Sequence, residues 1–547
     1  MISLLIAFNL GVATAPASQG AARELAFVQH EGLALTAPES VTVHSADESS
    51  STTSDVIAAA FSASGPNAGS PVRLAIAAAT AGPSVGLPVA APRTVGMSAE
   101  RLAAIDRVVA RGVKAGGYPG AAVVVGRKGA SVWEKGFGYL DWDRKSEPVI
   151  PESSIYDLAS LTKVVGTTTA LMILFDEGRI QLDDPVTKYI PGFAGGWKDS
   201  VTLRHLLEHR SGLPAGRELW RVAKSPEEAR QMVIETPLQS RPGARFEYSD
   251  LGADMLGFVV EAVSGKSLDT FLAERVYRPL GMMDTFFRPA DSLRARIAPT
   301  EVTPPRGYPL RGEVHDENAY ALGGVAGHAG LFSTAADLSI FAQMMLNGGV
   351  YNGVRIVADS TVRLFTTRAT VGTRALGWDT CDNNGGCGSY LSDRAYGHTG
   401  FTGTSLWIDP DREMFVILLT NRVHAARARQ PAKVISDVRS DLADAAALAV
   451  TDGPDGVLAW PASFRADRAV GWNRPERPIR SRRSRGAGSH RKNSRHVTRA
   501  KSSKSKRSAH RTTVKKASSG KATVKKSPSG KATVKKSPAK KSTAKKH

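Results

Sequence analysis

Cysteine is scarce in this sequence of 547 residues, since only Cys381 and Cys387 are present. A structural zinc site needs four ligands, and this pair has no second cluster of Cys or His beside it, so no such site is expected. In an exported protein the two thiols could close a small loop, which would stabilise the fold by about 2 kcal/mol. Two free thiols in a surface loop would fit the same spacing, and the sequence leaves both interpretations open.

Long hydrophobic runs are missing as well. No apolar stretch reaches the roughly 18–20 residues that span a bilayer, so no transmembrane helix is expected. Residues 1–17 resemble a secretory signal peptide, with an apolar stretch that ends in the cleavage-type sequence Ala15-Pro16-Ala17. No basic residue precedes Arg23, which a chance Ala-rich terminus or a misplaced start codon would explain. We expect an exported protein, located in the periplasm, the cell envelope or the medium.

Acidic residues are absent from one long segment of the chain. Residues 477–547 contain 26 Lys+Arg and no Asp or Glu, whereas residues 1–476 carry 46 basic and 51 acidic side chains and a formal charge of −5. The total charge of +21 therefore comes from the tail. It does not identify the rest of the chain as a nucleic-acid-binding domain.

The basic tail has low complexity and repeats a ten-residue unit from Thr513. A repeat of Lys, Ser, Ala and Thr cannot bury a core, so we expect residues 477–547 to be disordered. No aromatic residue follows Trp472, so the tail could attract an anionic polymer in a salt-sensitive way without reading bases. A wall polymer, lipopolysaccharide or nucleic acid would fit this chemistry, and a solvated tail with no dedicated partner is the alternative.

The remaining sequence divides into one folded domain and two linkers. Residues 18–95 are rich in Ala, Ser, Thr, Pro and Gly without sustained periodicity, which predicts a mostly disordered linker. Helical spacing of apolar residues begins after Ser98, and strand-like segments occur near both ends of residues 96–450. This pattern predicts an α+β domain at 96–450 whose two ends share one sheet, followed by a linker at 451–476. The predicted strands are 121–126, 131–138, 404–408 and 414–419, and a closing helix is predicted at 432–447.

Ser160 and Lys163 form a Ser-x-x-Lys motif at the start of an apolar run, Val164–Phe175. On a helix, positions i and i+3 share one face, so the hydroxyl and the amine would meet at the helix start. There the backbone N–H groups and the dipole favour developing negative charge, and a nearby amine can activate a weak nucleophile. The motif alone is weak evidence, because Ser503 and Lys506 in the tail match it too.

Two further motifs follow in order, Tyr-Ser-Asp at 248–250 and His-Thr-Gly at 398–400. Together with the Ser-x-x-Lys motif they resemble the serine β-lactamase and penicillin-binding-protein family, and most of all its class C β-lactamase-like branch of D-Ala-D-Ala carboxypeptidases and esterases. The stretches RHLLEHRSGLP, GVAGHAGLFS and GHTGFTG are similar to that branch as well, and the resemblance spans about residues 96–450. It implies an α+β, β-lactamase/transpeptidase-like fold, with an antiparallel sheet flanked by helices and a mostly helical lobe.

The resemblance implies a role for each motif residue. Ser160 would be the acylated nucleophile, and Lys163 would take or relay its proton. Tyr248 would act as the base for acylation and for activating the deacylating water. Backbone N–H groups of Ser160 and Phe401 would form the oxyanion hole. The residues expected to face the substrate are Asp250, His398, Thr399, Gly400 and Phe401.

Two positions depart from the family's usual pattern. The middle motif usually ends in Asn, and a carboxylate at Asp250 would favour the protonated form of Lys163, which argues against a neutral lysine base. The third motif has His398 where many β-lactamases have Lys, and a neutral imidazole holds a substrate carboxylate less well than a permanent cation does. Both changes predict weak β-lactam turnover.

We therefore predict a serine hydrolase that works through an acyl-enzyme on an ester or a peptidoglycan-type D-Ala peptide. The alternative is a non-catalytic penicillin-binding-like protein held on anionic polymers by its basic tail, and the intact Ser160, Lys163 and Tyr248 argue against it. The segment His205–His209 (HLLEH) also matches a zinc signature. It falls within RHLLEHRSGLP, which the serine family explains, so no metal and no cofactor are expected.

Overall fold

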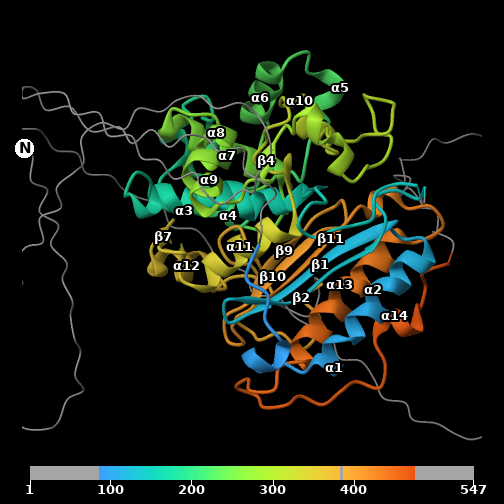
Figure 1. Cartoon of the computed structure of the whole chain (residues 1–547). Coiled ribbons are helices and arrows are strands. Elements are labelled where there is room, and N and C mark those ends of the chain that lie inside the picture. Colours follow the sequence, from blue (N-terminus) through green and yellow to red (C-terminus); the bar gives the residue numbers. More distant parts are fainter. Residues whose placement is uncertain (1–85, 144, 382–385, 475–547) are drawn as a thin grey trace, which may run out of the picture. The chain divides into compact units, whose positions relative to one another are not determined.

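The computed structural model describes residues 86–474 except residue 144 and residues 382–385 (Figure 1). This part of the chain has an α+β fold in which helices cover an antiparallel sheet, and it confirms the predicted fold class. Three predicted segments lie wholly or mostly outside the described residues: the signal peptide at 1–17, the linker at 18–95 and the tail at 477–547.

A six-stranded antiparallel sheet forms the centre of the fold, in the order β2-β1-β11-β10-β9-β8. β1 pairs with β11, so strands from the two ends of the domain lie side by side, as the sequence predicted (Figure 1). In this register Val124 lies opposite Ile417. The strands of this sheet are β1 (Gly120–Arg127), β2 (Ala130–Gly138), β8 (Asp379–Thr380), β9 (Tyr396–Thr399), β10 (Ser405–Asp409) and β11 (Met414–Thr420).

Helices cover both faces of the sheet, because its strands direct apolar side chains alternately to each face. Val123 and Val125 belong to the core that contains residues of α2 and α13, whereas Val124 belongs to the core that contains residues of α11. α2 and α13 pack against each other, and α11 packs on β1 and β11. The helices that cover the sheet are α1 (Ala99–Leu102), α2 (Ala104–Ala115), α11 (Ala335–Leu346), α13 (Pro431–Leu448) and α14 (Arg465–Arg468).

A lobe of short helices is inserted between β2 and β8 and shares its core with the α11 face of the sheet (Figure 1). Within the described residues, no helix combines the length and apolarity needed to cross a membrane. The lobe's helices are α3 (Thr169–Asp176), α4 (Leu203–Leu207), α5 (Leu219–Val222), α6 (Pro226–Glu235), α7 (Asp250–Ser264), α8 (Leu268–Leu272), α9 (Arg278–Leu280), α10 (Glu317–Ala321) and α12 (Asp359–Thr366). Two small sheets accompany them, β3 (Tyr156–Asp157) with β5 (Leu331–Ser333) and β4 (Phe286–Phe287), and β6 (Val350–Tyr351) with β7 (Val354–Arg355).

The folded domain is longer than the predicted range of 96–450 at both ends. Upstream, Ala90 N–H donates to the carbonyl of Ser131 (2.9 Å), and Leu87 is buried. Downstream, Trp472 is buried, and its indole N–H donates to Asp437 (2.8 Å). Each of these segments is held to the domain by isolated buried apolar side chains that have no regular spacing. The prediction, which relied on composition and periodicity, therefore assigned both segments to linkers.

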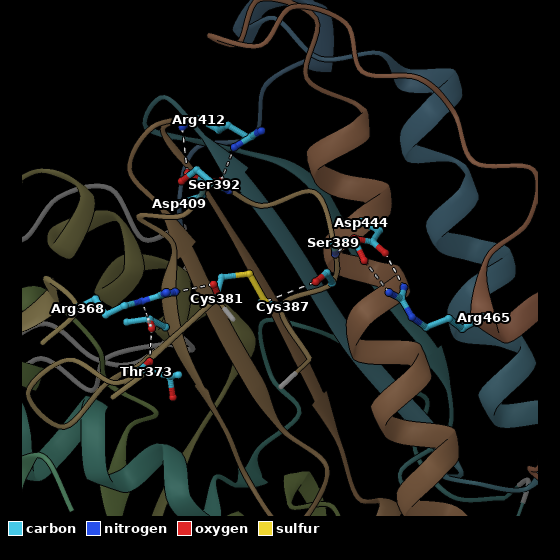
Figure 2. The surroundings of a disulfide bond; sticks show 12 residues. Arg368, Thr373, Cys381, Cys387, Ser389, Ser392, Asp409, Arg412, Asp444 and Arg465 are labelled. Atoms are coloured by element: carbon cyan, nitrogen blue, oxygen red, sulfur yellow. Dashed lines mark hydrogen bonds and ion pairs between the residues drawn. A yellow bond between two sulfur atoms is a disulfide. The ribbon is translucent and has the colours of Figure 1, made fainter. Parts of the chain in front are cut away.

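Cys381 and Cys387 form a disulfide, which decides between the two interpretations that the sequence left open (Figure 2). Their Cα atoms are 5.7 Å apart. The bridge closes a loop between β8 and β9, where Cys381 N–H donates to the carbonyl of Ala395 (3.1 Å). On its other side the Cys381 carbonyl accepts a hydrogen bond from Arg368 (2.7 Å; Figure 2). The disulfide therefore ties down the segment that leads into β9, the strand of the third motif.

Candidate active site

The segment around Ser160 is held in an unusual backbone conformation. Ala159, directly before it, has a φ of 47°, in the left-handed region that a residue with a Cβ seldom adopts. The buried Asp157 supports this turn, because its carboxylate accepts hydrogen bonds from the N–H groups of Ala159 (2.8 Å) and His315 (2.6 Å). The chain then runs through a 3₁₀ turn and a π-helical segment, Lys163–Thr168, before α3 begins. Strain and π-helical turns of this kind often occur at functional sites.

Lys163 brings the first two motifs into direct contact. Its ammonium donates to Ser160 Oγ (3.0 Å) and to the carbonyl of His328 (3.1 Å). It also forms an ion pair with Asp250 Oδ1 (2.7 Å), while only 4% of the Lys163 side chain is exposed. The Ser160–Lys163 contact predicted from the i, i+3 spacing is therefore present in the structure.

The charge of Lys163 follows from its neighbours. Burial by itself lowers the pKa of this amine, but the Asp250 carboxylate and the Tyr248 phenol outweigh burial and raise the pKa above its ordinary value of 10.5. Lys163 is therefore a cation at neutral pH. This agrees with the sequence argument that a carboxylate at Asp250 disfavours a neutral lysine base.

Tyr248 lies just before α7, and its ring is next to two histidine rings, each tilted relative to it. The ring centroid of His209 is 4.5 Å away and that of His398 is 6.0 Å away, and the Lys163 ammonium is 5.0 Å from the Tyr248 ring centroid. Ser249 N–H donates to His209 Nδ1 (3.1 Å), which leaves that nitrogen without a proton. Burial, with the nearby Arg374 and Lys163, lowers the pKa of His209 well below its ordinary value, so a neutral imidazole supports the Tyr248 ring.

His398 is a neutral imidazole on β9, next to the Lys163 site. Its Nδ1 lies 2.8 Å from the Thr399 carbonyl, which can only accept, so Nδ1 carries the proton. Its Nε2 then faces the guanidinium of Arg374, at 3.4 Å from Nη1. Burial lowers the pKa of His398 well below 6.5, and the cations of Arg374 and Lys163 act in the same direction.

Arg374 is the functional candidate that the sequence motifs did not reveal. Besides His398, its guanidinium lies over the ring of Tyr248 at 5.2 Å from the centroid and forms an ion pair with Asp379 (3.4 Å). The third motif itself has no permanent cation, as the sequence predicted, but Arg374, which lies outside that motif, places one beside His398. A β-bridge between Arg374 and Asp379 places it there, and no short motif reports such a pairing.

The turn after β9 is fastened to the Ser160 segment. Thr402 and Thr404 donate through their hydroxyls to the carbonyls of Asp157 (2.8 Å) and Leu158 (2.9 Å). Gly400 is required at this approach, since a Cβ there would lie 2.4 Å from the Leu158 carbonyl oxygen. The turn thus brings Thr399, Gly400 and the 60% exposed Phe401 beside Ser160. The proposed oxyanion hole at the N–H groups of Ser160 and Phe401 stays a prediction.

The residues of the zinc-like motif act in different places. His205 Nδ1 accepts a hydrogen bond from the Thr202 N–H (3.2 Å) at the start of α4, whereas His209 supports Tyr248 as described above. Within the described residues, no group of three or more His, Cys, Asp or Glu side chains is arranged to hold a metal ion.

A comparison with known families identifies the chain. The model of the Beta-lactamase family matches residues 105–439, which is more than half of the sequence. The chain belongs to the β-lactamase family. It is therefore a serine hydrolase of that family, as the motifs predicted.

Relatives within the family include a protein of Escherichia coli (strain K12) described as "Putative D-alanyl-D-alanine carboxypeptidase". It is 36% identical over 375 residues, which cover 62% of this chain and 86% of the relative. A protein of Salmonella schwarzengrund (strain CVM19633) with the same description is 36% identical over 377 residues, which cover 62% of this chain and 87% of the relative.

Two solved structures share the fold. A penicillin-binding protein homologue from Caulobacter crescentus has a TM-score of 0.50 and 22% identity, over 60% of this chain and 93% of its own. EstCE1, a hydrolase with promiscuous acyltransferase activity, has a TM-score of 0.51 and 22% identity, over 62% of this chain and 99% of its own. At 22% identity, these two similarities support the fold assignment and nothing further.

Proposed function

We propose that this serine hydrolase removes the terminal D-alanine from a peptidoglycan-type peptide that ends in D-Ala-D-Ala. The observation that carries the proposal is the Arg374 guanidinium at 3.4 Å from His398, beside Tyr248. A permanent cation that can bind in a bidentate way suits the free carboxylate of such a peptide. The descriptions of the Escherichia coli and Salmonella relatives point to the same substrate class.

In the proposed reaction, Ser160 Oγ attacks the peptide carbonyl and its proton passes to Tyr248. Tyr248 accepts this proton as a phenolate, and Lys163 stays protonated and stabilises both that phenolate and the negative charge that develops on the attacking Ser160 oxygen. Tyr248 then gives the proton to the leaving D-alanine nitrogen, and the same group takes a proton from the water that hydrolyses the acyl-enzyme. N–H groups of Ser160 and Phe401 would hold the oxyanion in both steps.

The test compares two peptides that differ only at the C-terminus. One peptide is an acylated L-Lys-D-Ala-D-Ala with a free C-terminal carboxylate, and the other is its C-terminal amide. The value of kcat/KM should be at least 10²-fold higher for the free acid, because only its carboxylate can pair with the Arg374 guanidinium. Equal rates for both peptides, or cleavage of simple esters alone, would contradict the proposal. β-Lactam turnover should be weak, since the Asp250 carboxylate stands where the family usually has an uncharged amide.

Replacing Asp250 with Asn should change the pH dependence of the reaction. Burial lowers the pKa of Lys163, and the Asp250 carboxylate raises it. Removing the carboxylate therefore makes the Lys163 ammonium lose its proton at lower pH. Because the proposed reaction needs the cation, the alkaline limb of the pH–rate profile should move to lower pH in Asp250→Asn. The measurement is ester hydrolysis from neutral to alkaline pH, with Asp411→Asn, which removes a surface ion pair to Arg394, as the control. An unmoved alkaline limb would show that Asp250 does not set the charge of Lys163.

We also propose that the chain is exported and that its tail binds anionic polymers. The Cys381–Cys387 disulfide supports export, because such bonds persist in oxidising compartments.

Deletion of residues 477–547 should leave hydrolysis nearly unchanged, since the site lies within the folded domain. It should abolish retention on heparin or teichoic acid, because the formal charge changes from +21 to −5. The full-length protein should elute from the heparin or teichoic acid column as the salt concentration rises. If the truncated protein binds the column as tightly as the full-length protein, the tail is not what binds anionic polymers.

A further inference from the structure

A buried histidine of the helical lobe, His328, lies between two carboxylates. His328 lies in the loop before β5, and only 2% of its side chain is exposed. Its Nδ1 is 2.7 Å from Asp254 Oδ1 on α7, and its Nε2 is 2.9 Å from Asp316 Oδ1 at the start of α10. Asp254 is completely buried, whereas 34% of the Asp316 side chain is exposed.

The geometry determines the charge of His328. An ionised carboxylate can only accept hydrogen bonds, and a neutral imidazole has a single N–H. A neutral ring could therefore donate a hydrogen bond to only one of the two carboxylates. With both carboxylates ionised, contacts at both nitrogens therefore require an imidazolium. Burial alone lowers the pKa of His328, but Asp254 and Asp316 outweigh it and raise the pKa well above 6.5. Burial alone would raise the pKa of Asp316, and the His328 cation instead holds it below its ordinary value.

The backbone of the same loop reaches the reacting groups. The His328 carbonyl accepts a hydrogen bond from the Lys163 ammonium (3.1 Å), and the neighbouring Gly327 carbonyl accepts one from Thr167 (2.7 Å). Gly327 is pressed against α7, since a Cβ there would lie 2.0 Å from the Ala253 carbonyl oxygen. The loop is thus fixed on one side to α7 and on the other to the π-helical segment that carries Lys163.

We propose that His328 is a positioning residue for Lys163. Its imidazolium joins Asp254 of α7 to Asp316 of α10 and thereby fixes the carbonyl that orients the Lys163 ammonium between Ser160 and Asp250. It also neutralises two carboxylates, one of which, Asp316, is close enough to Lys163 to interact with its charge. The inference rests on the proposed function only in so far as Lys163 serves Ser160.

The first variant, His328→Gln, removes the cation and one of its two hydrogen bonds. Lys163 then loses its fixed carbonyl partner, and labelling of Ser160 by a fluorophosphonate probe should slow by about 10²-fold, the cost of a small misplacement in a reacting group. The apparent affinity for the probe should stay unchanged. His424→Gln is the matched control, because His424 also contacts a carboxylate, Asp141 (3.0 Å), but does not contact Lys163.

A second variant, Asp316→Asn, keeps the fold while changing the charge. Asp316 caps α10 by accepting from the N–H groups of Asn318 and Ala319, and Asn is an equally good N-cap residue. Loss of this carboxylate lowers the pKa of His328, because the charged ring keeps only Asp254 as its anionic neighbour. The labelling rate of Asp316→Asn should therefore fall as pH rises through this lowered pKa, over a range in which the wild-type rate does not fall.

The ring itself can be observed directly. In nitrogen NMR spectra of protein labelled at histidine, both ring nitrogens of His328 should carry protons at neutral pH, whereas His398 should show one protonated nitrogen. A neutral His328 ring, or wild-type labelling rates and pH profiles in both variants, would overturn the inference. If wild-type Ser160 is not labelled at all, the proposed function fails, and the NMR spectra still decide the charge of His328.

Discussion

Ser160→Ala should abolish acylation and reduce peptide hydrolysis by about 10⁴- to 10⁶-fold, the loss seen when a serine hydrolase lacks its nucleophile. The reason is the contact between Ser160 Oγ and the Lys163 ammonium (3.0 Å), within a site that also holds Tyr248. The measurement is mass spectrometry of the intact protein after incubation with a penicillin or a fluorophosphonate, followed by mapping of the adduct.

Ser153→Ala provides the matched control, because Ser153 lies a few residues upstream of the site and its side chain is not part of it. This variant should be labelled at the wild-type rate. An adduct on any serine other than Ser160, or equal labelling of Ser160→Ala, would refute the assignment of the nucleophile. It would also revive the alternative of a non-catalytic binding protein.

Arg374→Ala should have the second largest effect, and the effect should depend on the substrate. For a D-Ala-D-Ala peptide with a free carboxylate, kcat/KM should fall about 10²-fold or more, because truncating one partner of a desolvated charge pair costs about 2–5 kcal/mol. For the C-terminal amide of the same peptide, the change should be small. Arg374→Lys should recover part of the loss, since it restores the charge without the bidentate geometry.

The control for this prediction is Arg394→Ala, which removes an arginine from an exposed ion pair with Asp411. It should behave as wild type on both peptides. Equal losses on the free acid and on the amide would mean that Arg374 only supports Tyr248 and His398. A circular dichroism spectrum of each variant separates a change in recognition from a change in folding.

The local part of the active site was predictable from the sequence because it depends on short-range geometry. Ser160 and Lys163 are three residues apart, and any helical turn brings such residues together. The chemistry of Asp250 was also predictable, because a carboxylate beside an amine favours its protonated form in any arrangement that lets them meet. The pairing of strands from the two ends of the domain followed from their position and their alternating pattern.

Only the tertiary structure revealed the charges that surround this centre. Arg374 reaches His398 through a β-bridge to Asp379, and His328 reaches Lys163 through a loop packed between two helices. Neither contact has a fixed spacing in the chain, so no motif could report it. The domain limits were missed for the same reason, since Leu87 and Trp472 are buried as single anchors without a regular pattern.

The sequence by itself thus determined the nucleophile motif, the fold class and the family, because these depend on local spacing and on the order of motifs along the chain. The tertiary structure decided which cation faces the His398 imidazole and what orients the Lys163 ammonium. Electrostatic interactions act through space and strengthen with burial, and both separation and burial are set only when distant segments pack together.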